Sequence, residues 1–312
     1  MYYNRRANLG NMSIEFTIMK EATNKMVFDL FLVEINGVVD RQKIYGYDDD
    51  SERFTAFQIA VVSWMSSWEH QPDTVHCHDH HTGLIPFMMQ YCYDFSRLKQ
   101  VRTVFTIHNA QYQGRMGWEK SRYIPRWDLW KRGMLDWADA INPLASGVKC
   151  ATTVTTVSHS YMEELRFNSN GLEKLFEYEK GKCIGILNGI DNEVWNPETD
   201  KYLTEHFAVK EVTKGKQKNK EALCEQFGFD PAKALFVFIG RLVGEKAADI
   251  LPEAIMSSIN NTQGEASFLI LGSGDTPVEW QFQQMVAPFH GVFSAVIGYD
   301  ETLRHKMCAC AA

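Results

Sequence analysis

Short apolar runs alternate along this chain with longer stretches in which apolar residues recur every three or four positions. The short runs are typical of buried strands and the longer stretches of helices. The predicted strands are 27–33, 74–77, 101–107, 152–157, 183–187, 234–239, 267–271 and 294–297. The predicted helices include 53–69, 84–93, 161–164, 219–227 and 250–258. Strands that alternate with helices indicate an α/β fold, with parallel sheets covered by helices on both faces.

The apolar run 183–187 stops abruptly at Asn188-Gly189 and divides the pattern into two halves. Asn and Gly tolerate the positive φ angles of a tight turn, and Asp191 would then point into a cleft. We therefore expect two Rossmann-like domains that face a cleft, one over residues 1–186 and the other over 187–312.

Bulk composition excludes several classes of protein. Hydrophobic residues make up 45% and charged residues 23% of the 312 positions, which is ordinary for a globular protein. The net charge of −7 argues against a nucleic-acid partner, and no apolar run reaches the roughly 18 residues that a membrane-spanning helix needs. No apolar h-region follows the charged residues at the start, and the seven cysteines are scattered, so we expect a cytoplasmic protein without a signal peptide, with free thiols and no membrane partner.

Four histidines lie within six residues in the sequence H-C-H-D-H-H-T-G, at positions 76–83, where a strand should end and a helix begin. A zinc site is one interpretation, although no outlying Cys or Glu cluster completes it. A second is a loop in which Asp79 caps the helix through its side chain. The third is a substrate-facing loop, because open α/β sheets bind ligands at the carboxyl ends of their strands.

The next strand leads to His108 and Asn109, within the sequence V-F-T-I-H-N-A-Q-Y-Q-G. Both side chains can form hydrogen bonds with sugar hydroxyls at the edge of a sheet. A histidine at such a position can also be a satisfied core residue. The Asn that follows directly, and then the Tyr-Gln-Gly sequence that includes Tyr112, favour the functional interpretation.

Two cations, Arg241 and Lys246, follow the apolar run 234–239 and precede another apolar helix. A guanidinium fork, a mobile ammonium and a helix N-terminus together favour binding of a diphosphate. Gly272 and Gly274 follow the next strand, which indicates close approach of the backbone to a nucleotide. Tyr299 follows the strand after that; it would either stack on a base or pack in the core.

These motifs together resemble the family of bacterial glycogen synthases and plant starch synthases. The motifs are H-x-H-D-x-H-T-G, T-I-H-N-x-x-Y-Q-G, L-N-G-I-D-x-x-x-W-N-P, G-R-L-x-x-x-K, and L-G-x-G-D followed by I-G-Y. The resemblance runs from about Tyr45 to the C-terminus. It implies a GT-B fold and extension of α-1,4-glucan from ADP-glucose with retention, as in glycogen biosynthesis.

The resemblance also implies roles for individual residues. Arg241 and Lys246 would hold the donor diphosphate, His108 would contact the transferred glucose, and Asp79 would lie beside the reacting centre. Asn188 would line the glucose pocket and Tyr299 would pack on adenine. The full set of expected substrate-binding residues is His81, Asn109, Tyr112, Asn188, Asp191, Gly272, Gly274 and Tyr299. The family needs no bound metal ion or other cofactor, because the nucleotide sugar is itself the substrate.

Several departures from the family pattern matter. The family's K-x-G-G-L loop and its E-P-C-G-L-type segment do not occur in these 312 residues. His80 stands where the family has tryptophan, and Ala247 where it has glycine. We therefore expect both domains to be incomplete, and the chain as written to be a fragment with little activity and poor solubility. Two alternatives remain: another retaining GT-B transferase such as sucrose synthase, or a non-catalytic module that binds a sugar nucleotide or a glucan.

Overall fold

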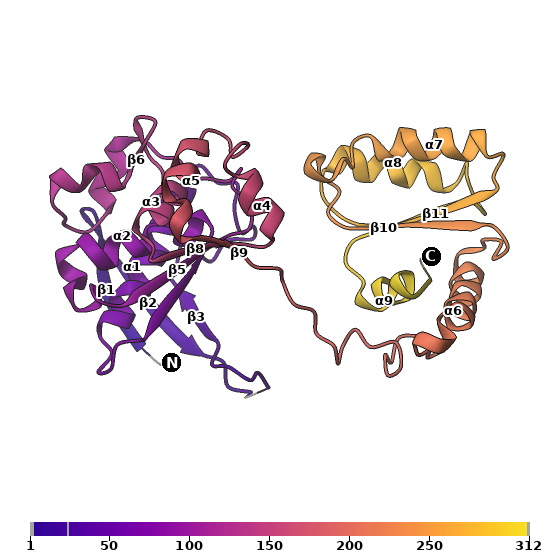
Figure 1. The fold of residues 1–312 in the computed structure, drawn as a ribbon, viewed down its shortest axis with the longest axis horizontal. Helices are drawn as coiled ribbons and strands as arrows, with labels where there is room; N and C mark the ends of the chain where they lie inside the picture. Colours follow the sequence, from indigo (N-terminus) through magenta and orange to yellow (C-terminus); the bar gives the residue numbers. More distant parts are fainter. Residues whose placement is uncertain (1–2, 24, 311–312) are drawn as a thin grey trace. The chain divides into compact units, whose positions relative to one another are not determined.

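The computed structural model describes residues 3–23 and 25–310. The chain divides into two compact units, the first ending at Asn188 and the second beginning at Gly189 (Figure 1). This division lies two residues beyond the boundary expected from the sequence. Each unit contains its own sheet and its own buried core.

The first unit is built on a parallel four-stranded sheet of order β4-β5-β8-β9. Its strands are β4 (Thr74–His78), β5 (Arg102–Ile107), β8 (Thr153–Thr156) and β9 (Cys183–Gly185). Three of the predicted strands are confirmed to within a residue or two, but the last is shorter than predicted. At its last residue this strand passes close to the start of the helix at His159–Glu164, since a Cβ at Gly185 would lie 2.4 Å from the carbonyl oxygen of Ser158.

Helices and short 3-10 turns pack around this sheet in one apolar core that includes Phe87, Phe105 and Phe176. The α-helices are α1 (Asp50–Ser66), α2 (Ile85–Tyr91), α3 (Pro143–Cys150), α4 (His159–Glu164) and α5 (Glu173–Glu179). The 3-10 helices are η1 (His80–Thr82), η2 (Tyr93–Leu98), η3 (Trp118–Tyr123), η4 (Leu129–Met134) and η5 (Lys180–Lys182). A two-stranded ribbon joins β6 (Asp136–Trp137) to β7 (Ala140–Ile141).

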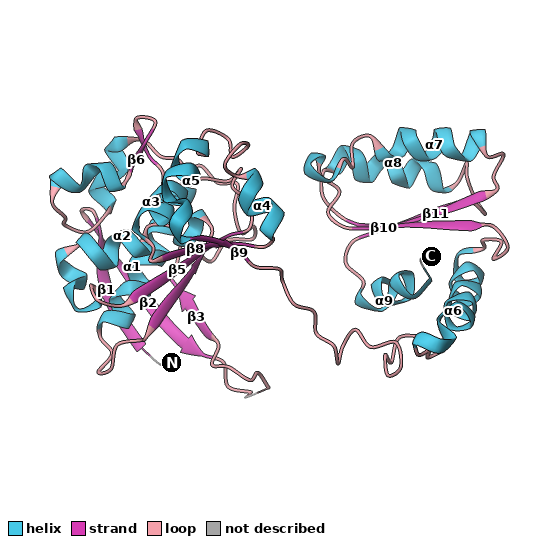
Figure 2. Ribbon diagram, viewed as in Figure 1, coloured by secondary structure: helices cyan, strands magenta, loops and turns pink. Residues whose placement is uncertain are grey.

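The start of the chain forms an antiparallel sheet, where the sequence predicted only one strand, at 27–33. Its order is β1 (Tyr3–Leu9), β2 (Met12–Lys20) and β3 (Phe31–Glu34) (Figure 2). The strand predicted at 27–33 is wrong over its first half, because Val27 is fully exposed in a loop. Gly10, with φ of 59°, makes the tight turn that joins the first two strands.

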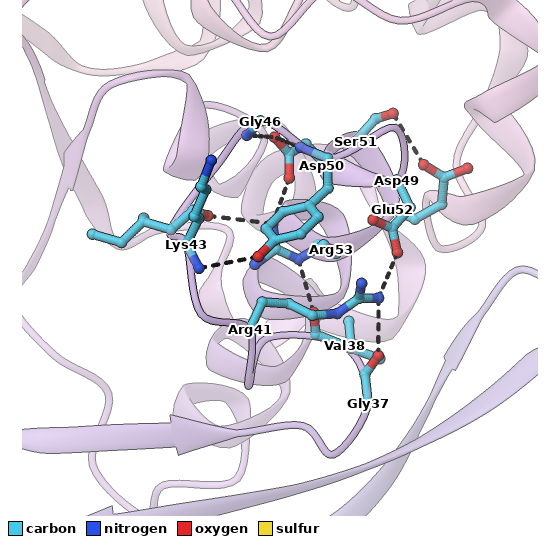
Figure 3. Close-up of polar contacts among 12 residues, drawn as sticks. Gly37, Val38, Arg41, Lys43, Gly46, Asp49, Asp50, Ser51, Glu52 and Arg53 are labelled. Atoms are coloured by element: carbon cyan, nitrogen blue, oxygen red, sulfur yellow. Dashed lines mark hydrogen bonds and ion pairs between the residues drawn. The ribbon is translucent and has the colours of Figure 1, made fainter. Parts of the chain in front are cut away.

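A buried arginine fixes the approach to helix α1, as the contacts in Figure 3 show. Arg53 is only 2% exposed; its Nε donates to the carbonyl oxygen of Val38 at 2.8 Å, and its guanidinium pairs with Asp50. Asp50 also accepts hydrogen bonds from the backbone amides of Gly46 and Tyr47. Burial raises the pKa of Asp50, but these donors outweigh it and hold that pKa below its usual value. The helix therefore begins at Asp50, three residues before the predicted start.

The second unit has a parallel sheet of order β10-β11-β12. The strands are β10 (Ala234–Ile239), β11 (Ala266–Gly272) and β12 (Phe293–Ile297), all at the predicted places. Figure 1 shows helices α7 (Leu251–Asn261) and α8 (Thr276–Val286) on one face of this sheet. Helices α6 (Val212–Phe227) and α9 (Glu301–Cys310) cover the other. Alternate residues of β11 fill the two cores: Ile270 faces one pair of helices, and Leu269 and Leu271 face the other.

The segment that joins the two units corrects a second expectation. Neither Asn188 nor Gly189 has a positive φ, so the predicted tight turn does not form. Instead Ile186 donates its amide to Thr156 at 2.9 Å, and the chain then leaves the sheet in an extended conformation. Residues 190–208 form turns that lead to η6 (Val209–Glu211) and helix α6.

Candidate active site

Asp79 and His108 lie together at the carboxyl ends of β4 and β5. The backbone amide of His108 donates to Oδ1 of Asp79 at 2.8 Å, and the amide of Asp79 donates to Thr106 at 2.9 Å. Asp79 has a φ of 55°, a conformation that costs energy in a residue with a side chain. Its side chain makes no capping bond to η1, so the helix-cap interpretation is wrong. The carboxylate instead fixes the neighbouring loop that bears His108.

Three imidazoles form a row beside this carboxylate. Nδ1 of His78 and Nε2 of His108 are 3.0 Å apart and share a hydrogen bond, while the ring of His76 lies 4.2 Å from that of His78. Nε2 of His76 contacts the hydroxyl of Thr106 at 2.6 Å. Partial burial, followed by the neighbouring imidazoles, lowers the pKa of both His76 and His78. Neutral rings are therefore favoured, and a neutral His78 can share a single proton with His108.

The ring centroids of His80 and His81 lie 3.8 Å apart with their planes tilted by 35°, and the rings of His81 and Phe54 lie 4.4 Å apart, nearly perpendicular. Burial, and then the proximity of His81, lowers the pKa of His80 to about 4. Within residues 3–23 and 25–310, no group of three or more His, Cys, Asp or Glu side chains is arranged to hold a metal ion. The histidines of this loop pack against one another, and His81 also packs against Phe54.

A cavity of about 420 Å³ opens beside His80. It is lined by His80, Gln111, Tyr112, Gln113, Gly114, Arg115 and Asn170. A Cβ at Gly114 would lie 2.6 Å from the His80 ring, so this backbone can approach the ring only without a side chain. Asn109 is used locally, since its Oδ1 accepts the amide of Gln111 at 2.9 Å. Tyr112 thus lines a cavity that could accept a ligand; His81 directly follows the lining residue His80, and Asn109 lies two positions before the lining residue Gln111.

The pKa of His80 predicts how acid affects stability. A native state that keeps His80 neutral until pH of about 4 binds fewer protons than the unfolded chain, whose histidine titrates near 6.5. Stability therefore falls as the pH is lowered through this window. Replacing His80 with Phe should reduce that loss by on the order of 1–2 kcal/mol.

Urea denaturation of the wild type and of His80→Phe at pH 7 and at pH 5 measures this difference. The matched control is His70→Phe, because His70 is exposed in the same unit. An equal dependence on pH in the wild type and in His80→Phe would contradict the prediction.

In the second unit a cavity of about 320 Å³ lies at the carboxyl ends of β10, β11 and β12. It is lined by Ile239, Gly240, Arg241, Leu271, Gly272, Ser273, Gly298, Tyr299, Asp300 and Arg304. Parallel α/β sheets bind ligands at this end. Tyr299 is 79% exposed, so the alternative that it packs in the core is wrong. Its hydroxyl donates to Glu301, and this bond raises the pKa of Tyr299.

Two glycines allow β11 to pass very close to the loop after β10. A Cβ at Gly272 would lie 1.9 Å from the carbonyl oxygen of Gly240, and one at Gly274 would lie 2.3 Å from that of Leu242. Gly272 lines the cavity, whereas Gly274 lies outside its lining and donates its amide to Glu279 at 2.7 Å. The two glycines thus allow the end of β11 to lie against the loop that follows β10. Of the two, Gly272 faces the cavity.

Arg241 and Lys246 flank this cavity differently. The Arg241 side chain lines it, is 55% exposed and pairs with Glu245 at 3.3 Å. Lys246 is exposed at the end of η7 (Gly244–Lys246), outside the cavity lining. Ala247 follows with φ of 53°, the conformation for which the family uses glycine. The structure therefore brings Arg241 together with Gly272 and Tyr299, and leaves the lysine on a neighbouring turn.

The two remaining candidates, Asn188 and Asp191, lie in the segment between the sheets. Both are exposed, and Oδ1 of Asp191 accepts the amides of Glu193 and Val194 at 3.0 and 3.1 Å. Among the cavity residues that were not candidates from the sequence is Arg304. It lies in the first turn of α9, directly after the I-G-Y sequence, and that position was the available signal.

Comparison with known proteins identifies the family. A sequence model described as the starch synthase catalytic domain matches residues 3–178. This chain belongs to the starch synthase catalytic domain family. The resemblance drawn from the motifs is thereby confirmed.

Relatives within this family are longer than the chain. It is 48% identical to a glycogen synthase of Flavobacterium johnsoniae over 301 residues, which cover 96% of the chain and 64% of that protein. It is 36% identical to a glycogen synthase of Streptococcus sanguinis, over 87% of the chain and 58% of that protein. The chain thus spans about three-fifths of the length of these curated relatives.

A solved structure supports the fold of the family. The catalytic domain of Starch Synthase IV from Arabidopsis thaliana, bound to ADP and acarbose, matches with a TM-score of 0.86 and 27% identity. The match covers 100% of this chain and 65% of that one. The prediction of an α/β fold of the GT-B type, with two Rossmann-like units, is therefore confirmed.

Proposed function

We propose that the protein is a glucan synthase that transfers glucose from ADP-glucose to the non-reducing end of an α-1,4-glucan, with retention, in glycogen biosynthesis. The observation that carries this proposal is the cavity at the carboxyl ends of β10, β11 and β12, where Arg241, Gly272 and Tyr299 meet. A nucleoside diphosphate would be bound by such a set of groups: a cation for the phosphates, a backbone that can approach the nucleotide closely, and an exposed aromatic ring for the base. The relatives that are named glycogen synthase, and the starch synthase structure with bound ADP, support the same assignment.

The donor would be held by the second unit. Arg241 offers a planar fork of donors to the diphosphate, and Lys246 offers a mobile charge on the next turn. Negative charge grows on the departing ADP as the bond to glucose breaks. Cations already in place would stabilise that charge without reorganisation, which is the largest catalytic effect open to such a site. Tyr299 would pack on the adenine ring.

The glucose and the acceptor would be contacted by the first unit and by the segment after it. His108 would contact the transferred glucose and Asp79 would lie beside the reacting carbon; the hydrogen bond from the backbone amide of His108 to the Asp79 carboxylate supports this pairing of roles. The other proposed substrate contacts are His81, Asn109, Tyr112, Asn188 and Asp191. Of these, Tyr112 is supported by its place in the cavity beside His80.

The proposal also states which cofactors and partners the reaction does not need. It includes no metal ion or other resident cofactor, no nucleic-acid partner and no membrane partner, and it places the protein in the cytoplasm. Among the residues described, none of the helices is both long and apolar enough to span a bilayer.

The test uses a version of the protein extended to the length of its relatives, incubated with ADP-glucose carrying a labelled glucosyl group and with glycogen as the acceptor. We expect label in the polymer, ADP as the second product, and the same rate after treatment with EDTA. Binding of ADP and of maltooligosaccharide without any transfer would favour a non-catalytic binding module instead. A rate that EDTA abolishes and Mg²⁺ restores would show that the cofactor part of the proposal is wrong.

A further inference from the structure

His305, on helix α9, is buried in a polar contact that the proposed reaction does not use. It is 1% exposed, its Nδ1 lies 2.6 Å from Oδ2 of Asp200, and its Nε2 lies 3.2 Å from Oε1 of Glu301. Its ring stacks on Trp195 with centroids 3.9 Å apart and planes 6° from parallel. Both hydrogen-bond partners are carboxylates, so each ring nitrogen acts as a donor when both bonds form.

Glu301 connects this buried histidine to the cavity at the strand ends. Its Oε2 accepts the hydroxyl of Tyr299 and lies 3.4 Å from Nη1 of Arg304. Both Tyr299 and Arg304 line the cavity of about 320 Å³. His305 is therefore separated from two cavity side chains by a single carboxylate.

Asp200 and Trp195 attach the segment after the first unit to the same helix. Asp200 is 8% exposed, and its carbonyl oxygen lies 2.9 Å from Nε2 of His206. Arg304 lies over the ring of Trp195, with its guanidinium carbon 4.7 Å from the centroid. A buried polar network whose groups are all bonded is rigid, because breaking any of its bonds leaves a group unsatisfied away from water. Here the buried members of the network, His305 and Asp200, are bonded to each other, and His305 is also bonded to Glu301, whose other oxygen contacts side chains at the edge of the cavity.

We propose that His305 is a positioning residue for nucleotide binding. It anchors Glu301 against Asp200 and Trp195, so that Glu301 in turn holds Tyr299 and Arg304 at the edge of the cavity. The inference rests on the proposed function, since the ligand of that cavity is taken to be the nucleoside diphosphate of the donor.

Two substitutions test the contacts of the two imidazole nitrogens one at a time. The amide nitrogen of Asn can take the place of Nδ1 and keep the contact with Asp200, whereas that of Gln can take the place of Nε2 and keep the contact with Glu301. We expect His305→Asn to bind ADP about tenfold more weakly than the wild type, because a hydrogen bond to a charged group is lost. His305→Gln should bind ADP nearly as well as the wild type. Isothermal titration calorimetry of the full chain with ADP measures both affinities.

A purely structural role would have a different signature. Both variants lose the ring stack, and His305→Gln also leaves the buried Asp200 carboxylate without its imidazole partner, so its melting temperature should fall at least as far as that of His305→Asn, although His305→Asn binds ADP more weakly. His290→Asn is the matched control, because His290 is exposed in the same unit, and it should leave affinity unchanged. Glu301→Gln, at a partly exposed site, provides a second variant if His305→Asn does not fold, and it should also weaken binding.

The possible failures are distinguishable. Equal affinities in the Asn and Gln variants, with the wild type binding ADP, would overturn the positioning role alone. A wild type that does not bind ADP would overturn the proposed donor site, and the inference with it.

Discussion

Replacing Lys246 with alanine, in a version of the protein completed to the length of its relatives, is expected to lower the turnover number by about 30- to 1000-fold, which corresponds to about 2–4 kcal/mol of lost transition-state stabilisation. The residue is exposed on the turn that follows β10, and the proposed role has its four-carbon side chain extend to the phosphates of the donor. Its charge would matter most as negative charge grows on the departing ADP. The effect should therefore appear mainly in kcat and only weakly in KM.

The control for this prediction is Lys210→Ala. Lys210 is also exposed within a single 3-10 turn of the second unit, at Val209–Glu211, but far along the chain from the strand ends. Its removal should leave kcat unchanged. An unchanged kcat in Lys246→Ala would remove Lys246 from the catalytic set, and a rise in KM alone would restrict it to binding of the ground state.

The sequence predicted the parallel sheets well because their strands are continuous apolar runs. Strand β10 was predicted at its observed bounds, and β11 to within one residue at each end. The antiparallel strands at the start were missed, since β1 carries mostly polar, exposed residues and depends on its pairing with β2. Val27 and Phe28 were misassigned to a strand because apolar character alone does not reveal that a side chain is exposed.

Some contacts of the candidate site could be predicted from the order of strands along the sequence, and others could not. Asp79 and His108 each follow a strand, and those strands are neighbours, so their proximity could be expected. The contact between His78 and His108 depends on ring orientations that only the folded backbone sets. The contact between Asp200 and His305 joins residues 105 positions apart in the sequence. A local sequence pattern cannot predict a contact between residues so far apart in the chain.

Replacing Gly272 with alanine should lower the free energy of unfolding of the second unit by about 3 kcal/mol, the upper end of what overpacking usually costs. The new methyl would lie 1.9 Å from the carbonyl oxygen of Gly240, a distance that no rotation of a side chain can relieve. The amide of Gly240 donates to Leu271 at 3.1 Å, and that of Gly298 donates to Gly272 at 2.9 Å. Relief of the clash must therefore strain the strand ends on both sides of β11.

Those strand ends form the proposed nucleotide cavity, so the same substitution should also weaken ADP binding. Gly244→Ala is the matched control: it lies on the loop after β10, and a Cβ there meets nothing within 4 Å. Urea denaturation and ADP titration of the two variants should show a large loss in Gly272→Ala and little change in Gly244→Ala. Equal stability and affinity in both would mean that β10 and β11 can separate at low cost. The close approach at Gly272 would then not be what shapes the cavity.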